Sequence, residues 1–295
     1  MHIDNLGYHP IRFAYQLEDF FRTFIARWEN ARQDVPENAG GLLAGIMLEH
    51  SFRDMIREHA DSLPVHIVEH ADWWGPHIEH AVSAYKDYRQ ENDEIHHFAP
   101  DLALALSQAA PPDLKYTDLQ LPCKTFYIRF DHAVSLGPMK IVDGVYVKDY
   151  TDLGSDLDPA VEFTFTSVTP SFHYGKRIPP IQFLTMDPTY SFLLMFDEEK
   201  TVAESLASCL REETQEVGWD SDAGLDWFPI VPKLMGLVVN CLSYMSRHDG
   251  EYVYPHYTPE TMLAAVREAP DEVHRAQALD DLYAHGFQQI TFHYE

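Results

Sequence analysis

The sequence predicts an α+β fold in which an N-terminal helical region precedes a central, mostly antiparallel sheet and C-terminal helices. Apolar residues recur at three-and-four spacing from residue 11 to about 110, two consecutive prolines then interrupt the pattern, and β-branched and aromatic runs follow. Because Pro111 and Pro112 remove backbone donors and disfavour helical geometry, we place a boundary there. We expect a helical region over 1–112 and an α+β domain over 113–295.

Four helices are expected before that boundary. The first runs from Ile11 to about Asp34, and a second begins after Gly40 and stops before Pro64. Residues 78–88 are amphipathic, and 95–106 continue in the same style. The first helix carries one broad apolar stripe, formed by Phe13, Leu17, Phe20, Phe21, Phe24, Ile25 and Trp28.

Strands are predicted at 125–130, 141–147, 161–168, 183–185 and 191–196, with a strand pair or a bulge at Asp143-Gly144. Helices return at Thr201, which forms a capping box with Glu204 and starts a helix that runs to residue 218. Further helices are expected at about 229–245, from residue 258 and from residue 270, the last closed by Gly286.

Composition limits the classes of function. The 295 residues carry a net charge of -26, which repels nucleic-acid phosphates and anionic membranes, and no stretch reaches the roughly 20 apolar residues of a membrane helix. The start of the chain lacks the basic and apolar regions of a secretion signal, and Cys123, Cys209 and Cys241 are widely spaced among apolar neighbours. We expect a cytoplasmic protein with reduced thiols, for which the acidity indicates either solubility alone or a basic partner.

One local pattern indicates metal chemistry. Residues 66–70 read H-x-x-E-H, and on a helix this spacing places His66 and His70 one turn apart with Glu69 between them, as in inverted zinc peptidases. A zinc-dependent hydrolase is therefore an alternative function. The competing interpretation is that these are ordinary surface or core side chains in a chain with 17 histidines.

Other chemical motifs are weak or missing. Acidic residues alternate over 220–226 as in a calcium loop, but Val231 stands at the twelfth position, where a bidentate Glu is needed, so an acidic surface loop is favoured. The sequence contains no G-x-S-x-G, no G-x-x-x-x-G-K, no G-x-G-x-x-G and no paired C-x-x-C. We therefore expect no cofactor unless zinc is bound.

Three separated blocks resemble a family of phage and plasmid proteins that includes a type V-A anti-CRISPR. They are FAPDLALAL at 98–106 with LPCKTFYIRF at 121–130 and DGVYV at 143–147; KTVAESL at 200–206; and LVVNCLSYM at 237–245 with DGEY at 249–252. The resemblance implies host defence evasion: recognition of the nascent N-terminal part of a defence nuclease, still attached to the ribosome, and a lowered level of its messenger RNA.

That resemblance implies a protein or basic-peptide partner, and an extended peptide can lie along a sheet edge beside aromatic side chains. From the predicted hairpin we expect six peptide-binding residues, although the aromatic ones also suit an ordinary sheet core. A third function remains open, that of an acidic decoy that blocks a nucleic-acid-binding enzyme. The six residues are Tyr127, Arg129, Asp131, Asp143, Tyr146 and Asp149.

Overall fold

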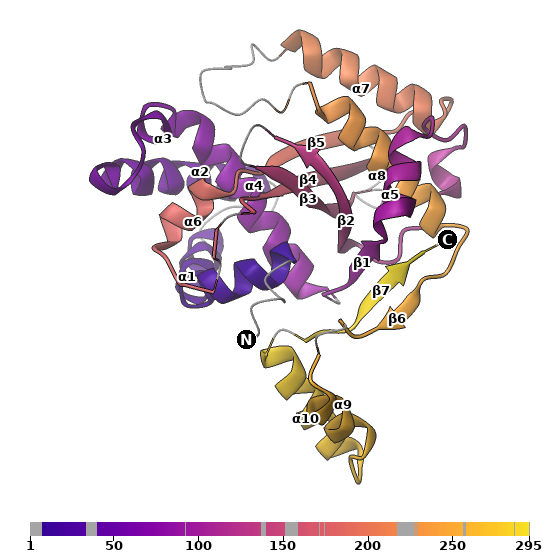
Figure 1. Cartoon of the computed structure of the whole chain (residues 1–295). Coiled ribbons are helices and arrows are strands. Elements are labelled where there is room, and N and C mark those ends of the chain that lie inside the picture. Colours follow the sequence, from indigo (N-terminus) through magenta and orange to yellow (C-terminus); the bar gives the residue numbers. More distant parts are fainter. Residues whose placement is uncertain are drawn as a thin grey trace.

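The protein is a mixed α+β fold, seen in a computed structural model, with one sheet covered by helices on both faces (Figure 1). None of the helices in the described part of the chain is long and apolar enough to cross a membrane. The structure describes residues 8–33, 40–91, 93–136, 140–150, 159–170, 172–173, 175–216, 227, 229–255, 258–285 and 287–294.

The N-terminal region is largely helical, as the sequence predicts, and its helices cover one face of the sheet. They are α1 (His9–Gln33), α2 (Gly40–Glu58), η2 (Ala60–Ser62), α3 (Val65–Glu69) and α4 (Ala71–Gln90). Buried side chains of α1, α2 and α4 form one apolar core with Tyr127 and Tyr146 of the sheet. Close packing of α2 on α4 depends on Gly75, because a Cβ there would lie 2.7 Å from Cγ of Arg53.

The sheet has seven strands in the order β5-β4-β3-β2-β1-β7-β6. β1 runs parallel to β2 and β7, and the other neighbours are antiparallel, so the expectation of a mostly antiparallel sheet is confirmed. The strands are β1 (Ile95–Phe98), β2 (Thr125–Ser135), β3 (Ile141–Asp149), β4 (Ala160–Val168), β5 (Tyr190–Met195), β6 (Glu251–Val253) and β7 (Ile290–His293).

Two local predictions are wrong. Residues 95–98 form strand β1 rather than the start of a helix, because Ile95 and Phe98 are buried on opposite faces of the sheet; helix α5 (Pro100–Gln108) begins only after it. Residues 183–185 lie in helix α6 (Pro180–Met186) rather than in a strand, and Pro180 occupies its first turn. The domain boundary at residue 112 stays a prediction. Strand β1 lies before this boundary in the sequence, whereas β2 and β7, the strands that pair with β1, lie after it.

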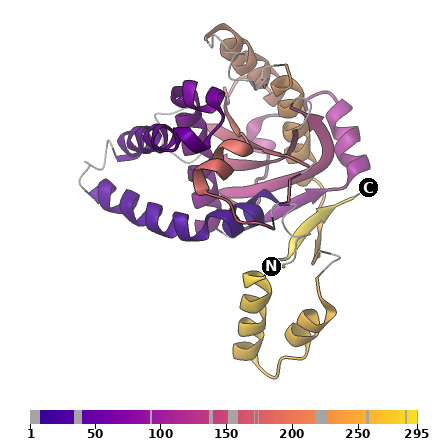
Figure 2. The same ribbon diagram turned by 60° about the vertical axis from the view of Figure 1, so that its left-hand side comes forward.

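Helices α5, α7 (Val202–Glu216) and α8 (Val231–Met245) cover the opposite face and share a second apolar core with β2 to β5. The predicted capping box is confirmed, since Thr201 Oγ1 accepts from the Glu204 amide at 3.3 Å and the Glu204 carboxylate accepts from the Thr201 amide at 2.8 Å. Helices α9 (Glu260–Arg267) and α10 (Glu272–Ala284) form a hairpin that projects from the body (Figures 1 and 2). The expected helix cap at Gly286 lies outside the described residues. The three cysteines are free thiols, as the sequence predicts.

Candidate functional site

Asp143 is the extra residue of a bulge in β3. Its neighbours Val142 and Gly144 face the consecutive β4 residues Ser167 and Thr166, so Asp143 has no partner of its own in β4. An extra residue in one strand re-aims the side chains around it. The carboxylate thereby reaches the arginine side chain of α1, and the irregularity predicted at Asp143-Gly144 is confirmed as a bulge.

Gly144 makes room for Tyr127 of the neighbouring strand. A Cβ at residue 144 would lie 2.1 Å from the Tyr127 hydroxyl and 2.5 Å from the carbonyl oxygen of Ile128. The Tyr127 ring therefore crosses β3, and its hydroxyl lies 3.0 Å from Oγ1 of Thr166. Because Thr166 donates its own proton to Asp143 at 2.9 Å, Tyr127 is the donor of the other bond. A chain of two hydrogen bonds thus ends on the Asp143 carboxylate.

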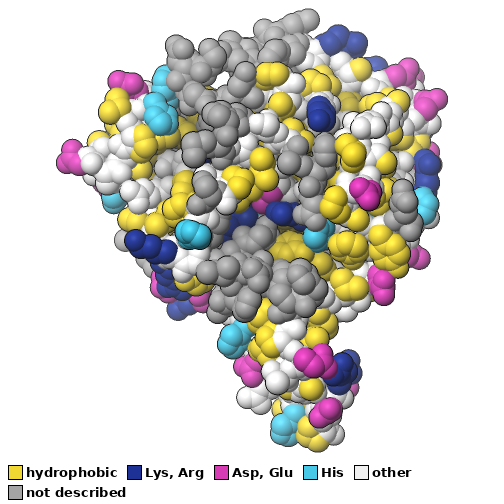
Figure 3. Space-filling view, viewed as in Figure 1, with side chains coloured by type: hydrophobic (Ala, Val, Ile, Leu, Met, Phe, Trp, Pro, Cys, Tyr) yellow, Lys and Arg dark blue, Asp and Glu magenta, His cyan; other side chains and the backbone are white. Residues whose placement is uncertain are grey.

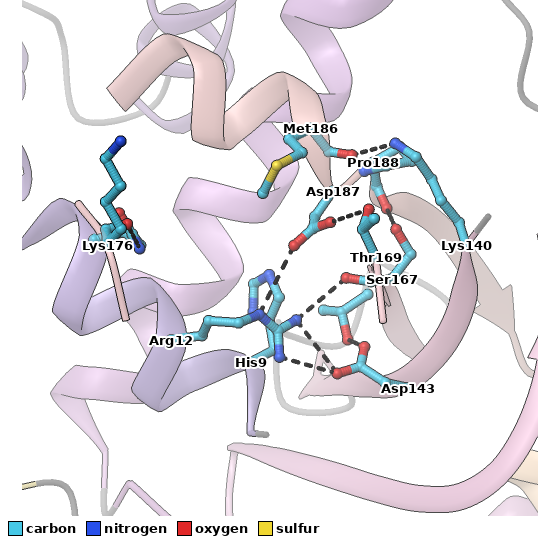
Figure 4. A network of polar contacts seen from close by, with 12 residues as sticks. His9, Arg12, Lys140, Asp143, Ser167, Thr169, Lys176, Met186, Asp187 and Pro188 are labelled. Carbon is cyan, nitrogen blue, oxygen red and sulfur yellow. Dashed lines mark hydrogen bonds and ion pairs between the residues drawn. The ribbon is translucent and has the colours of Figure 1, made fainter. Parts of the chain in front are cut away.

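Arg12 connects α1 to this carboxylate. Its side chain is fully buried, and Nη1 and Nη2 each lie 3.3 Å from Oδ2 of Asp143 (Figure 4). Nη2 also donates to the carbonyl oxygen of Ser167 at 3.2 Å, and Nε lies 3.8 Å from Oδ2 of Asp187. From β2, Nη1 of Arg129 donates to the same Asp143 oxygen at 3.0 Å. Two guanidinium groups therefore bind one buried carboxylate.

The network is electrically balanced, with two arginines against Asp143 and Asp187. Burial pushes the pKa of Asp143 upward, but Arg12 and Arg129 outweigh it and hold that pKa below its ordinary value. Burial and the adjacent Arg12 lower the pKa of His9 to about 3, so its imidazole is neutral and lies 3.0 Å from the Tyr146 hydroxyl. Paired in this way, the buried charges fasten α1 to the sheet.

One edge of the network reaches solvent. The side chain of Arg129 is 19% exposed, and its guanidinium lies 5.9 Å from the centre of the Tyr8 ring. The Tyr8 hydroxyl in turn lies 2.9 Å from Nδ1 of His97. In the space-filling view, a few Lys and Arg side chains lie near the centre of the face (Figure 3). The side chain of Arg129 is thus more exposed than those of Arg12, Asp143 and Asp187, so a partner can reach it most easily.

The structure brings together four of the six predicted binding residues. Tyr127, Arg129, Asp143 and Tyr146 all belong to the cluster, and the two tyrosines are buried. Asp149 lies at the far end of β3, where it lines a cavity of about 200 Å³ with Tyr116 and Phe196. The side chain of Asp131 lies outside the described residues. A peptide-binding role for the six stays a prediction.

Sequence reasoning missed the part that α1 contributes. His9, Arg12 and Gln16 are buried, and they recur at three-and-four spacing beside the apolar stripe that begins at Phe13. Polar residues on the buried face of a helix need partners, and this spacing was the available signal. Asp187 and Thr166 come from separate elements and carry no such local signal.

The H-x-x-E-H segment forms no metal site with other described residues. His66 and Glu69 are exposed on the five-residue helix α3, and His70 follows it. Across the described part of the chain, no group of three or more His, Cys, Asp or Glu side chains is arranged to hold a metal ion. The acidic loop at 220–226 lies outside the described residues. Nothing in the described geometry therefore favours a zinc-dependent hydrolase.

Comparison with known proteins identifies the family. No curated protein and no solved structure matches the chain. Residues 96–280 match the AcrVA2-like family, described as the anti-CRISPR type V subtype A2 family. The matched region runs from β1 to α10 and includes β3 with Asp143 and Gly144. Because the match spans more than half of the sequence, this protein belongs to the AcrVA2-like family of type V anti-CRISPR proteins.

Proposed function

We propose that this chain inhibits a type V CRISPR effector by binding an extended segment of the effector and lowering its expression. The observation that carries the proposal is the family match over residues 96–280, which supports an anti-CRISPR role with a Cas effector as partner. Recognition of the nascent N-terminal part, and loss of the messenger RNA, are the finer steps of the proposal. These steps are what the family resemblance of the sequence blocks within 98–147, 200–206 and 237–252 implies.

Charge supports a protein partner. A net charge of -26 attracts a segment rich in Lys and Arg and repels phosphates. Of the predicted contacts, Arg129 and Asp149 keep part of their surface exposed, whereas Tyr127, Asp143 and Tyr146 are buried. We therefore propose that Arg129 and Asp149 contact the peptide and that the buried three position them.

A reporter assay tests the proposal. Coding sequence for the N-terminal segment of a type V effector is fused to a fluorescent protein and expressed with and without this chain, and both fluorescence and reporter messenger RNA are measured. We expect both to fall only for the fusion. Asp149→Lys should weaken the effect, because it reverses a charge that faces a basic segment. Asp280→Lys, at an exposed position of α10, is the matched control and should retain the effect.

A second measurement separates this function from direct inhibition. Purified chain is added to purified effector with guide RNA and target DNA, and cleavage is followed. Unchanged cleavage combined with a falling reporter message supports action on expression. Blocked cleavage with an unchanged reporter message would instead establish direct inhibition, as an acidic decoy predicts.

A further inference from the structure

A second cavity lies away from the polar network. It has a volume of about 510 Å³ and is enclosed by α1, the C-terminal part of α4, the turn at 175–177 and the end of α10. This volume falls in the range of about 300 to 1,000 Å³ that is typical of small-molecule sites. Four segments that are far apart in the sequence build it, so it is a product of the tertiary fold.

Arginines are the most numerous charged residues in the lining of the cavity. Arg22, Arg89 and Arg177 line it, and Glu18 is the acidic residue among the lining side chains. Each arginine has a carboxylate neighbour, at 3.4 Å from Glu18, 2.9 Å from Asp93 and 3.6 Å from Asp19 respectively. The pairs of Arg22 and Arg177 are more than half exposed on both sides, and ion pairs this exposed contribute little. These two guanidinium groups are therefore able to exchange their partners for a bound anion, whereas Arg89 is held by the less exposed Asp93 and by the Tyr283 hydroxyl.

Aromatic rings supply much of the remaining lining, together with the aliphatic residues Ala14, Leu17 and Ala284. Phe13, Phe21 and Tyr85 pack against one another with ring centres 4.6 to 5.8 Å apart. Two guanidinium groups lie over tyrosine rings: Arg177 is 5.3 Å from the centre of Tyr15, and Arg89 is 5.0 Å from the centre of Tyr283. The cavity thus combines flat apolar surfaces with cations held above rings.

We propose that this cavity binds a small organic anion with a flat aromatic ring, of which a nucleoside monophosphate is the best example. Arginine recognises phosphate through paired hydrogen bonds, and the Phe21 ring, which packs on the buried Phe13 and Tyr85 and keeps part of its own surface exposed, offers a surface for the base. The charge of -26 disfavours a long polyanion, whereas one phosphate meets only the local arginines. The ligand is therefore a free nucleotide rather than a nucleic-acid strand, and this site is separate from effector recognition.

Ligand binding at this place also fastens the projecting hairpin. Helix α10 is exposed along most of its length, and Leu282 is its buried residue, next to Tyr283 in the cavity wall. A molecule between Arg22 of α1 and Tyr283 of α10 adds contacts that only the docked hairpin makes. Binding should therefore slow hydrogen exchange in α10 as well as in α1.

Calorimetric titration of the full chain with AMP, adenosine and inorganic phosphate tests the proposal. We expect AMP to bind at least roughly tenfold more tightly than either part, because each part meets only one kind of surface. Arg22→Gln and Arg177→Gln should each weaken AMP binding by roughly tenfold. Arg275→Gln, at an exposed position of α10 outside the cavity, is the matched control and should bind AMP unchanged. Circular dichroism confirms that every variant is folded.

Three outcomes would overturn the proposal. AMP fails to bind at millimolar concentration; the cavity variants and Arg275→Gln bind AMP equally; or a short single-stranded RNA or an acidic aromatic peptide binds more tightly than AMP. The last would assign the cavity to a macromolecular partner instead. Slower exchange of α10 amides with AMP, abolished by Arg177→Gln, supports the site independently. Neither Arg129 nor Asp149 lines this cavity, so failure here leaves effector recognition untouched.

Discussion

Replacing Arg12 with methionine removes the cation that holds α1 against the sheet. Arg12 is fully buried; without it Asp143 keeps Arg129 as an ion-pair partner, and Asp187, which is 4% exposed, loses the guanidinium whose Nε lies 3.8 Å away. Removing one partner of a buried ion pair costs about 3–5 kcal/mol, because the other charge stays buried without compensation. We therefore expect Arg12→Met to lower the free energy of unfolding by about 3–5 kcal/mol at pH 7.

The same variant has a defined pH dependence. In the wild type the pKa of Asp143 lies below its ordinary value, because the arginines outweigh burial; the pair therefore stabilises the fold above about pH 4. This contribution is lost as the pH falls through the folded-state pKa. In Arg12→Met, the first of the charges that oppose burial is gone, so we expect the pKa of Asp143 to rise above its wild-type value and protonation to relieve the variant. The deficit measured by urea unfolding should shrink between pH 7 and pH 4.

Arg22→Met is the matched control on the same helix. The Arg22 side chain is 74% exposed and pairs with Glu18 at 3.4 Å, so its replacement should change the free energy of unfolding by less than about 0.5 kcal/mol. If Arg12→Met cost no more than Arg22→Met, or if its deficit were equal at pH 4 and pH 7, the buried network would not stabilise the fold as argued.

Three further changes test other parts of the fold by urea unfolding. Gly144→Ala should cost about 1–3 kcal/mol, because the new Cβ meets the Tyr127 hydroxyl; a neutral result would contradict the close approach. Burial raises the pKa of Glu79 to about 7, so wild-type stability falls as the pH rises from about 4.5 to 7; Glu79→Gln should stabilise at pH 8 and much less at pH 5, and equal effects would refute this. Thr201→Ala should cost about 0.5–2 kcal/mol through loss of the cap to Glu204, whereas an unchanged midpoint would deny the capping box a role.

Local patterns were sufficient for most of the fold. The apolar stripe through Phe13 and Leu17 predicted α1, and alternation over 161–168 predicted β4, since both signals reside in adjacent turns or adjacent strand residues. Strand β1 was missed because both of its faces are covered, which removes the alternation, and because it pairs in parallel with residues 127–130 and 291–293. Such pairing depends on distant partners, and a four-residue strand carries too little of its own pattern.

Only the part of the candidate site that lies on strands β2 and β3 could be predicted from the sequence. Tyr127, Arg129, Asp143 and Tyr146 lie on adjacent strands of a hairpin that the sequence predicts, so their meeting follows from the register. Arg12 and Asp187 come from helix α1 and from the residue after α6, and the docking of these elements depends on the whole core. For the same reason, the bond between Arg12 and the carboxylate of Asp143 could not be predicted from the sequence.

Raising the salt concentration distinguishes the exposed charges of the protein from the buried charges of the Arg12 network. Arg12, Arg129, Asp143 and Asp187 cancel one another, so the rest of the chain carries the full net charge of -26. At 0.1 M salt, screening largely removes the attraction between exposed charges that lie more than about 10 Å apart, but it acts much less on a buried pair. Raising salt should therefore weaken binding of a basic effector segment while leaving the Arg12→Met deficit nearly unchanged. If the deficit disappeared at 0.5 M sodium chloride, the Arg12 network would be solvated, and its burial could not be what anchors α1.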